Sequence, residues 1–377
     1  MGFEKIGLSA ELTAILNNKF KDPYPIQSQA IPAALKGRDV LGIAQTGSGK
    51  TAAFALPVLD QLPLDSTAKN RNIGALVLVP TRELAVQVEE VFKEFNNQLK
   101  QPYSIKAVYG GVSINPQMKG LYGVNILIAT PGRLLELQRS KALSLSKVSH
   151  LVVDEADKML DLGFKDEMAE VLKLLPAQRQ NMLFSATLND KVKAVRALVL
   201  KDAIVVKIKE QEQNLDLIQQ VAYLIQNDKK GPLLRKLIEE EGMQQVLVFT
   251  SSTFKADNVA KKLIGNGIKA AAIHGKKSQG SRTDSLQKFK GGNINVLVTT
   301  DLLARGIDIA FLPFVINYEL PRSPKDFIHR IGRTGRAENP GKAITFVSEE
   351  EEHHFKVIQK KMGKFIETID GDLLMRK

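Results

Sequence analysis

Short, continuously apolar runs alternate with longer amphipathic stretches along the whole chain, and this alternation constrains the fold most strongly. Strands that are apolar on both faces must be covered on both sides, so the pattern predicts parallel sheets with helices on both faces. The apolar runs are Val40–Ile43, Ala75–Val79, Ile105–Tyr109, Val124–Ala129, Leu151–Val153, Met182–Phe184 and Ile204–Val206, then Val246–Phe249, Ala270–Ile273, Asn295–Val298, Phe314–Ile316 and Ala343–Val347. We therefore predict the α/β class.

The chain repeats this architecture in two halves. Its 377 residues exceed what one hydrophobic core usually supports, which favours two domains. Between the halves lies a polar segment rich in Gln and Glu, which is typical of a linker. We predict a first domain over residues 1–206, a linker over 207–217, a second domain over 218–365 and a C-terminal tail over 366–377.

Composition narrows the class of protein. Without cysteine the chain has neither a disulfide framework nor a thiolate metal site, and no apolar run approaches the length of a membrane span. We therefore predict a cytoplasmic protein without membrane contact.

The net charge is +12, divided as +5 over residues 1–206 and +7 over 207–377. Two basic halves favour a polyanion bound across both, although a solvated basic surface would give the same charge.

A small-residue loop follows the first apolar run and precedes a helix-forming segment. It reads Ala44, Gln45, Thr46, Gly47, Ser48, Gly49, Lys50 and Thr51. Such a loop points backbone N–H groups and a helix dipole at one place, which suits phosphate. Lys50 adds a charge for the β- and γ-phosphates, and the Thr51 hydroxyl is a Mg²⁺ ligand. The phosphate-loop pattern has Gly where Ala44 stands. We predict a nucleotide site; a glycine-rich turn is the alternative.

Carboxylates follow the apolar run Leu151–Val153. Asp154, Glu155 and Asp157 fall within four residues. In parallel sheets, ligands bind at the carboxyl ends of the strands, so these acids should lie beside the phosphate loop. We predict that Asp154 supplies the second protein contact to Mg²⁺ and that Glu155 orients or deprotonates the attacking water. A solvated acidic turn is the simpler alternative.

Other strand ends carry hydroxyls, glycines and arginines. In the first half these are Thr81 and Arg82, Gly110 and Gly111, Thr130 and Arg133, and Ser185 and Thr187. Each pair alone is a common turn or helix cap. Together along one rim they suit a sugar-phosphate backbone bound without base reading.

The second half carries an arginine-rich run, His329–Arg336. Arg333 and Arg336 suit the role of arginine fingers on the γ-phosphate of a nucleotide held by the other domain. A basic patch that only grips nucleic acid is the alternative. The segment Thr299–Asp308 again follows an apolar run, and Arg282 is a further arginine suited to phosphate.

In this order, the motifs resemble those of the DEAD-box ATP-dependent RNA helicases of superfamily 2, which are named after the tetrapeptide found here at 154–157. The resemblance runs from about Phe3 to Ser348 and implies two tandem RecA-like domains, each a mostly parallel sheet with helices on both faces. The stretches Tyr109–Met118 and Ala272–Gly280 are similar to the bacterial RhlE-type subgroup.

The resemblance implies a role for individual residues. Gln27 would read the adenine edge, Phe20 would stack on the ring, and Asp308 would touch the ribose. Coupling between nucleotide and RNA is implied for Asp157, Ser185, Thr187 and His329. RNA-backbone contacts are implied for Thr81, Arg82, Gly110, Gly111, Thr130, Arg133, Ser252, Arg282, Thr299 and Gly306. Tyr24 departs from the family pattern, which usually has Thr there.

From these motifs we predict an RNA-stimulated ATPase that uses ATP and Mg²⁺ and closes its two domains on RNA to open short duplexes. We expect a monomer, with ribosome-assembly or RNA-decay proteins as partners. Three other classes are weighed against it: a DNA helicase or translocase, a small-molecule kinase, and a non-catalytic RNA-binding scaffold. The intact Glu155, Arg333 and Arg336 argue against the scaffold, and a second basic domain argues against the kinase.

Overall fold

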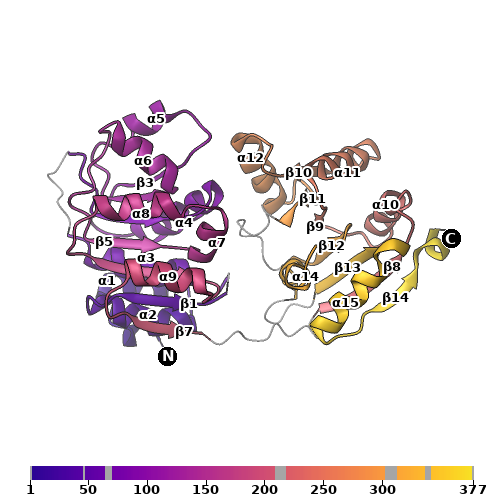
Figure 1. Ribbon diagram of the computed structural model, residues 1–377, viewed down its shortest axis with the longest axis horizontal. Helices are drawn as coiled ribbons and strands as arrows, with labels where there is room; N and C mark the ends of the chain where they lie inside the picture. Colours follow the sequence, from indigo (N-terminus) through magenta and orange to yellow (C-terminus); the bar gives the residue numbers. More distant parts are fainter. Residues whose placement is uncertain are drawn as a thin grey trace. The chain divides into compact units, whose positions relative to one another are not determined.

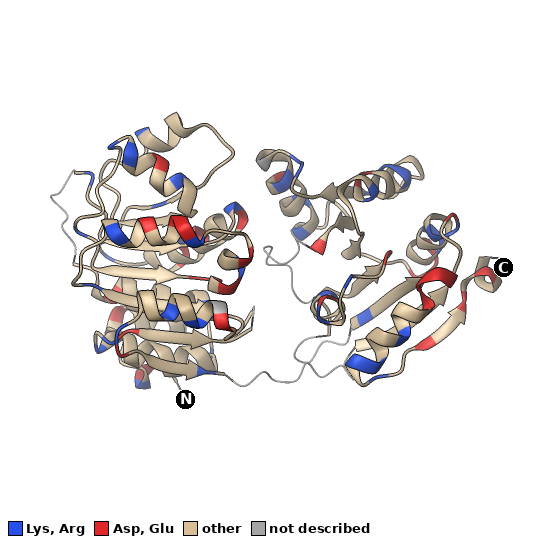
Figure 2. Cartoon of the chain, in the orientation of Figure 1, with Lys and Arg blue, Asp and Glu red and all other residues tan. Residues whose placement is uncertain are grey.

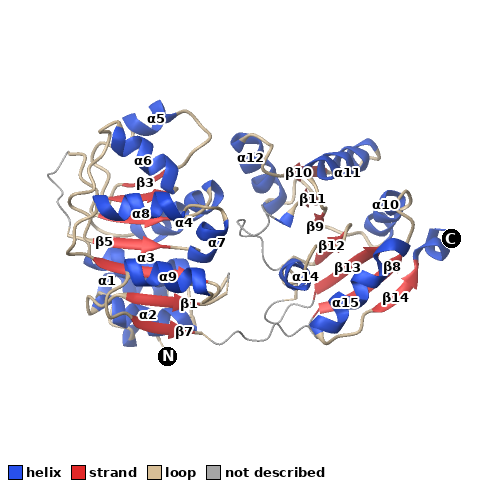
Figure 3. Cartoon of the chain, viewed as in Figure 1, coloured by secondary structure: helices blue, strands red, loops and turns tan. Residues whose placement is uncertain are grey.

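The chain divides into two compact units, Met1–Glu210 and Gln211–Lys377. The computed structural model describes residues 2–45, 47–63, 70–208, 218–301, 312–335 and 341–375. Most of the predicted linker therefore lies outside the described residues. Each unit consists of a central sheet with helices packed on it, as Figure 1 shows by element and Figure 3 by type of structure.

The first unit is built on a seven-stranded sheet with the order β3-β4-β2-β5-β6-β1-β7. All its strand pairs are parallel. The strands are β1 (Val40–Ile43), β2 (Ala75–Leu78), β3 (Ile105–Val108), β4 (Ile126–Ala129), β5 (His150–Val153), β6 (Gln180–Ser185) and β7 (Ile204–Lys207). The helices are α1 (Ala10–Asn17), α2 (Pro25–Leu35), α3 (Lys50–Gln61), α4 (Arg82–Asn96), α5 (Ile114–Lys119), α6 (Pro131–Arg139), α7 (Ala156–Asp161), α8 (Lys165–Leu174) and α9 (Asp190–Val199).

Alternate strand residues of this sheet enter two separate cores. Val40 and Val77 pack with Phe54 and Phe92 of α3 and α4 on one face. Leu41, Leu76 and Leu78 pack with side chains of α6 to α9 on the other. Successive side chains of a strand point to opposite faces, so a run that is apolar throughout can bury both. The sequence pattern thus accounts for the two helix layers.

The second unit has a seven-stranded parallel sheet with the order β10-β11-β9-β12-β13-β8-β14. Its strands are β8 (Ile218–Leu224), β9 (Val246–Phe249), β10 (Ala270–Ile273), β11 (Val296–Thr299), β12 (Phe314–Asn317), β13 (Gly341–Val347) and β14 (Glu367–Asp370). Its helices are α10 (Lys230–Glu240), α11 (Thr253–Gly265), α12 (Gln279–Lys290), α14 (Pro324–Ile331), α15 (Glu352–Met362) and α16 (Gly371–Met375). One core lies beneath α10 and α11, and two smaller ones lie on the other face.

Two strands of the second unit were missing from the prediction. β8 carries Gln219 and Gln220 near its start, which breaks the apolar run, and β14 is the polar sequence Glu-Thr-Ile-Asp. The assignment of 366–377 to a tail outside the domain was wrong, because β14 pairs with β8 as the last strand of the sheet. An edge strand needs few apolar residues, since it is only partly covered.

The predicted fold class is confirmed: both units are parallel sheets with helices on both faces. Among the described residues, the predicted strand-end motifs follow the carboxyl ends of parallel strands and so lie along one edge of each sheet. Within the described residues, no helix has the length and apolar character needed to cross a membrane.

Candidate functional site

The phosphate loop joins β1 to the first residue of α3. Gly47 and Gly49 have φ values of 81° and 84°, a region in which glycine is the usual residue. Lys50 is the first residue of the helix and is buried, and its Nζ donates to the carbonyl oxygen of Ala44 at 2.6 Å. The Ala44 N–H in turn donates to the carbonyl of Ser185 at the end of β6. The loop therefore folds around the ammonium group that is predicted to contact phosphate.

A buried carboxylate lies beside this ammonium group. Asp154 follows β5 and is almost fully buried. Burial raises the pKa of Asp154 to about 7, although the nearby positive charge of Lys50 acts in the opposite direction. Its Oδ1 accepts the N–H of Glu155, whose backbone has a φ of 49°. A left-handed conformation is uncommon for a residue other than glycine and costs about 1 kcal/mol, so the chain is strained where the acids meet the loop.

Gln27 connects α2 to the phosphate loop. Its Oε1 accepts the N–H of Tyr24 at 2.9 Å, and its Nε2 donates to the carbonyl of Gly49 at 3.1 Å. Each end of the amide keeps one further hydrogen-bonding position. The Tyr24 ring lies against Gly49, where a Cβ atom would come within 3.0 Å of it. Phe20 is 36% exposed, and Lys19 Nζ lies over its ring, 5.6 Å from the ring centroid.

Asp157 and Thr187 are joined directly. The Oδ2 atom of Asp157 accepts the Thr187 hydroxyl at 3.0 Å and the Thr187 N–H at 3.1 Å. The Ser185 hydroxyl accepts the same N–H at 3.4 Å. Three of the four predicted coupling residues are thus in contact within the first unit, and the acids after β5 are tied to the end of β6.

The rim formed by β3, β4 and β2 brings the first-unit RNA candidates together. The guanidinium of Arg82 lies over Gly111, in the place that a Cβ atom would need. The Gly110 N–H donates to Thr130 Oγ1 at 3.4 Å, and Arg133 Nη2 donates to the carbonyl of Val112 at 2.8 Å. Arg133 is also paired with Glu136. The glycine turn after β3 is thereby contacted by residues that follow β4 and β2.

Thr81, the remaining candidate of this rim, caps α4. Its side-chain oxygen accepts the N–H of Leu84 at 3.3 Å.

The corresponding edge of the second unit carries Ser252, Arg282 and Thr299. Ser252 caps α11 by accepting the N–H of Lys255 at 3.2 Å, and Thr299 ends the neighbouring strand β11. Arg282 is buried in α12. Lysine and arginine are spread over helices of both units, as Figure 2 shows.

Glu319 was missed by sequence reasoning. Its Oε2 accepts both the N–H and the hydroxyl of Ser251 at 2.8 Å, and its Oε1 pairs with Lys255 at 3.1 Å. Burial raises the pKa of this carboxyl, but these partners outweigh burial and hold the pKa below its usual value. Glu319 therefore positions the turn before α11.

Arg330 was also missed. It forms a two-pronged ion pair with Asp301 at 2.5 and 2.7 Å, bonds the Glu319 carbonyl, and lies 5.0 Å from the Phe249 ring. A detectable signal existed: Phe327, Arg330 and Ile331 are spaced as one buried helical stripe. One arginine of the predicted finger motif is thus a structural residue of the second unit.

Arg333 is buried, and His329 lies on the exposed side of α14. Four predicted site residues lie outside the described residues: Thr46, Gly306, Asp308 and Arg336.

Family models match both units. A DEAD/DEAH box helicase model matches residues 24–195, and a model of the helicase conserved C-terminal domain matches residues 229–338. The chain belongs to the DEAD-box ATP-dependent RNA helicases. This DEAD-box helicase is 38% identical over 373 residues to the ATP-dependent RNA helicase CshA of Listeria monocytogenes, covering 98% of this chain and 70% of that one. It is 40% identical over 366 residues to the CshA helicase of Streptococcus pneumoniae, covering 97% and 69%.

Solved structures agree with this assignment. The DEAD-box helicase is similar to Saccharomyces cerevisiae Dbp5 bound to RNA and ADP BeF3, with a TM-score of 0.83 and 32% identity, covering 100% of this chain and 97% of that one. A DEAD box protein from Methanococcus jannaschii matches with a TM-score of 0.54 and 34% identity, covering 98% and 99%. The predicted RecA-like architecture is therefore confirmed. Both bacterial relatives carry the CshA name, so they do not confirm the RhlE-type assignment.

Proposed function

We propose that this DEAD-box helicase is an RNA-stimulated ATPase that couples ATP hydrolysis to closure of its two units on RNA. Closure would open short duplexes or remodel RNA–protein complexes without sequence preference. The observation that carries the proposal is that Lys50 and Asp154 are both buried and close enough to interact electrostatically, in the unit where Asp157 also bonds Thr187.

In this proposal Lys50 and the N–H groups of Gly47, Ser48, Gly49 and Thr46 bind the phosphates of ATP. Phe20 stacks on adenine and Gln27 uses its remaining hydrogen-bonding positions to read the base edge. Asp308 holds the ribose.

Asp154 and Thr51 fit a magnesium ion. Both supply oxygen, the donor that Mg²⁺ prefers, and a cation would offset the burial that raises the pKa of Asp154. When bound, Mg²⁺ neutralises charge that develops on the phosphates. Glu155 orients or deprotonates the attacking water: it lies near enough to Asp154 to interact with it electrostatically, and its Oε2 is 3.3 Å from Lys158 Nζ.

Arg333 and Arg336 complete the site from the second unit as arginine fingers. Because they belong to a different unit from Lys50, hydrolysis needs closure. RNA provides the reason for closure, since one polyanion contacts both units. His329 would extend the contact between Asp157 and Thr187 across the closed molecule, with Ser185 supporting Thr187.

RNA would lie along the two strand-end edges and contact them through its backbone, which explains the absence of sequence preference. Its 2′-hydroxyls would distinguish it from DNA. The proposed contacts are Thr81, Arg82, Gly110, Gly111, Thr130, Arg133, Ser252, Arg282, Thr299 and Gly306. We further propose a monomer that acts in the cytoplasm in ribosome assembly or RNA turnover, as expected for an RhlE-type member.

Arg333→Ala tests the interdomain site. The variant should bind a fluorescent ATP analogue normally but lose RNA-stimulated hydrolysis by about 10³-fold, because the transition-state charge loses its partner. Arg235→Ala is the matched control: this partly exposed arginine of α10 bonds Asn266 and should not affect turnover. Normal hydrolysis by a correctly folded Arg333→Ala protein would show that the interdomain site is misassigned. Comparing stimulation by single-stranded RNA and DNA tests the choice of nucleic acid.

A further inference from the structure

A lysine ammonium group of the first unit lies against the carboxylate of Glu155. Lys158 is the third residue of α7, the helix that begins directly after Glu155. Its Nζ lies 3.3 Å from Glu155 Oε2, and the two side chains are only 14% and 13% exposed. Both atoms are closed off from solvent, and neither forms a hydrogen bond within the described part of the chain. The ion pair therefore balances two charges that water does not reach.

A second lysine–carboxylate pair of the first unit has the same spacing but a different environment. Lys193 and Asp190 of α9 are also three residues apart, and their side chains are 59% and 96% exposed. Water and salt screen such a pair, so it holds neither side chain firmly. The pair between Lys158 and Glu155 is shielded from this screening and can hold the carboxylate in one place.

Glu155 needs such a hold, because it lies among other acids. Burial raises the pKa of Asp154 most, and the negative charges of Glu155 and Asp157 raise it further, so these carboxylates repel one another. The left-handed backbone of Glu155 fixes only the base of its long side chain. A cation in contact with the carboxylate offsets the repulsion and restricts the side chain.

We propose that Lys158 is a positioning residue that holds the Glu155 carboxylate where it acts on the attacking water. The inference rests on the proposed function, in which Glu155 orients or deprotonates that water. Lys158 contacts neither ATP nor RNA in this scheme and acts only through Glu155. A catalytic group works only when it is held in the productive geometry, so loss of the ion pair should slow the chemical step rather than weaken ATP binding.

Lys158→Met tests the proposal, because it removes the charge and keeps a side chain of similar length. Steady-state ATPase assays with saturating single-stranded RNA should show kcat lowered by about tenfold, with the KM for ATP and the half-saturating RNA concentration within about twofold of wild type. Lys158→Arg restores a cation and should recover most of the turnover. Circular dichroism checks folding, and Lys158→Gln, with the same expected loss, replaces a methionine variant that does not fold.

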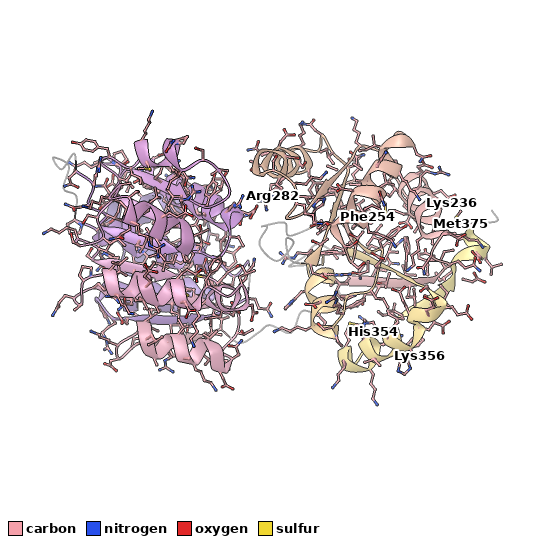
Figure 4. All side chains as sticks on the ribbon, turned by 45° about the horizontal axis from the view of Figure 1, so that its top comes forward. Lys236, Phe254, Arg282, His354, Lys356 and Met375 are labelled. Carbon is pink, nitrogen blue, oxygen red and sulfur yellow. The ribbon has the colours of Figure 1, made fainter. Side chains whose placement is uncertain are left out.

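Two control variants remove exposed ion pairs. Lys193→Met is the matched control in the same unit and should turn over like the wild type. Lys356→Met is the control in the second unit: Lys356 lies on α15 in the lower part of that unit (Figure 4), is 75% exposed and pairs with Glu352 at 3.9 Å. It should also behave like the wild type.

A double-mutant cycle separates positioning of Glu155 from a general structural role. Glu155→Gln alone should lower kcat by about 10²-fold or more. Adding Lys158→Met should cost nothing further, because the group that Lys158 positions is already changed. A further loss in the double variant, a raised KM for ATP, or equal turnover by Lys158→Met and Lys193→Met would overturn the inference. A folded Glu155→Gln protein with normal turnover would instead overturn the proposed function.

Discussion

The two units share one strand order but differ at the start of the helix that follows their first strand. Renumbered from its first strand, each sheet runs 3-4-2-5-6-1-7. In each unit the helix after the first strand begins with a buried lysine, Lys50 in α3 and Lys230 in α10. A glycine-containing loop precedes Lys50, whereas residues 225–229 before Lys230 contain no glycine. The same position in the same fold is therefore used for two purposes.

The partner of each lysine explains the difference. Lys50 Nζ is held by the neutral carbonyl of Ala44, so its charge remains available to phosphate. Lys230 Nζ is held at 2.7 Å by the carboxylate of Glu351, which the Ser348 hydroxyl also bonds. Glu351 neutralises Lys230 and ties α10 to the end of β13. Lys230 is thus an ion-paired structural residue, whereas Lys50 is held by a carbonyl and lies near a carboxyl group, Asp154, whose pKa burial raises.

Substituting both lysines by methionine separates these roles, and we expect the largest effects here. Lys50→Met should lower the RNA-stimulated turnover number by about 10²–10³-fold, because a charged partner of the phosphates is lost. Lys230→Met should leave turnover of the folded enzyme unchanged but cost about 2–3 kcal/mol of stability. That is less than the loss of a fully buried pair, because the Glu351 side chain is 29% exposed.

Steady-state ATPase assays and urea unfolding followed by circular dichroism measure the two quantities. If Lys230→Met abolished turnover while the protein stayed folded, the second unit would be using its lysine catalytically, and the contrast between the units would be broken.

A second contrast is between the carboxylates that follow β5 and β12, the central strands of the two sheets. Asp154 follows β5 and Glu319 follows β12, and their pKa values are displaced in opposite directions. For Asp154 burial dominates, because the Lys50 charge only partly offsets it. For Glu319 the bonds from Ser251 and Lys255 dominate over burial.

Opposite pKa displacements predict opposite pH effects. The pKa of Asp154 is raised above its unfolded value of 3.8, so its stabilising contribution is present at low pH and lost as pH rises through about 7. Without metal or nucleotide, Asp154→Asn should therefore gain stability relative to wild type between pH 5 and pH 8, on the order of a few kcal/mol.

For Glu319 the pH dependence of the contribution to stability has the opposite sign. Its pKa is lowered in the folded state, so its contribution is present above the unfolded value of 4.5 and is lost as pH falls through the folded pKa. Glu319→Gln should thus destabilise the protein at pH 7, and the difference from wild type should shrink at pH 4. Urea unfolding in EDTA-containing buffer measures both variants. Parallel pH profiles for the two variants would contradict the contrast.

Much of the first unit could be predicted from sequence because its signals are local. The phosphate loop and the acids after β5 each lie next to a continuous apolar run, and the topology then brings Lys50 and Asp154 together. The strands of the second unit were harder to predict from sequence. β8 and β14 carry polar residues at partly exposed positions, so their pairing depends on neighbouring strands rather than on their own composition.

Side-chain partners were predicted least well. The arginine-rich run contains Arg330 and Arg333, and only the fold shows that Arg330 is committed to Asp301. Asp301 lies 29 residues from Arg330 in the chain, so no local pattern specifies this partner. The cap that Thr81 forms on α4 is different: it spans three residues, and a helix cap was the alternative that the sequence itself offered.

Glycines at the two helix starts give the smallest effects. Gly49 precedes α3 with a φ of 84°, and an added Cβ would meet Gln27 Nε2 at 2.6 Å. Gly231 is the second residue of α10, and its Cβ would meet only the Tyr318 hydroxyl, at an ordinary 3.7 Å. Gly49→Ala should therefore cost about 1–2 kcal/mol from backbone strain and raise the KM for ATP, because Gln27 must move.

Gly231→Ala should stabilise the protein, by less than Gly49→Ala destabilises it. Alanine favours the helix and restricts the unfolded chain, so we expect a gain of about 0.5 kcal/mol in the free energy of unfolding. Turnover should not change, because no phosphate approaches this helix start in the proposed mechanism. Urea midpoints and KM values for both variants measure the difference. A raised KM in Gly231→Ala would mean that ATP senses the start of α10, and the distinction between the two helix starts would then fail.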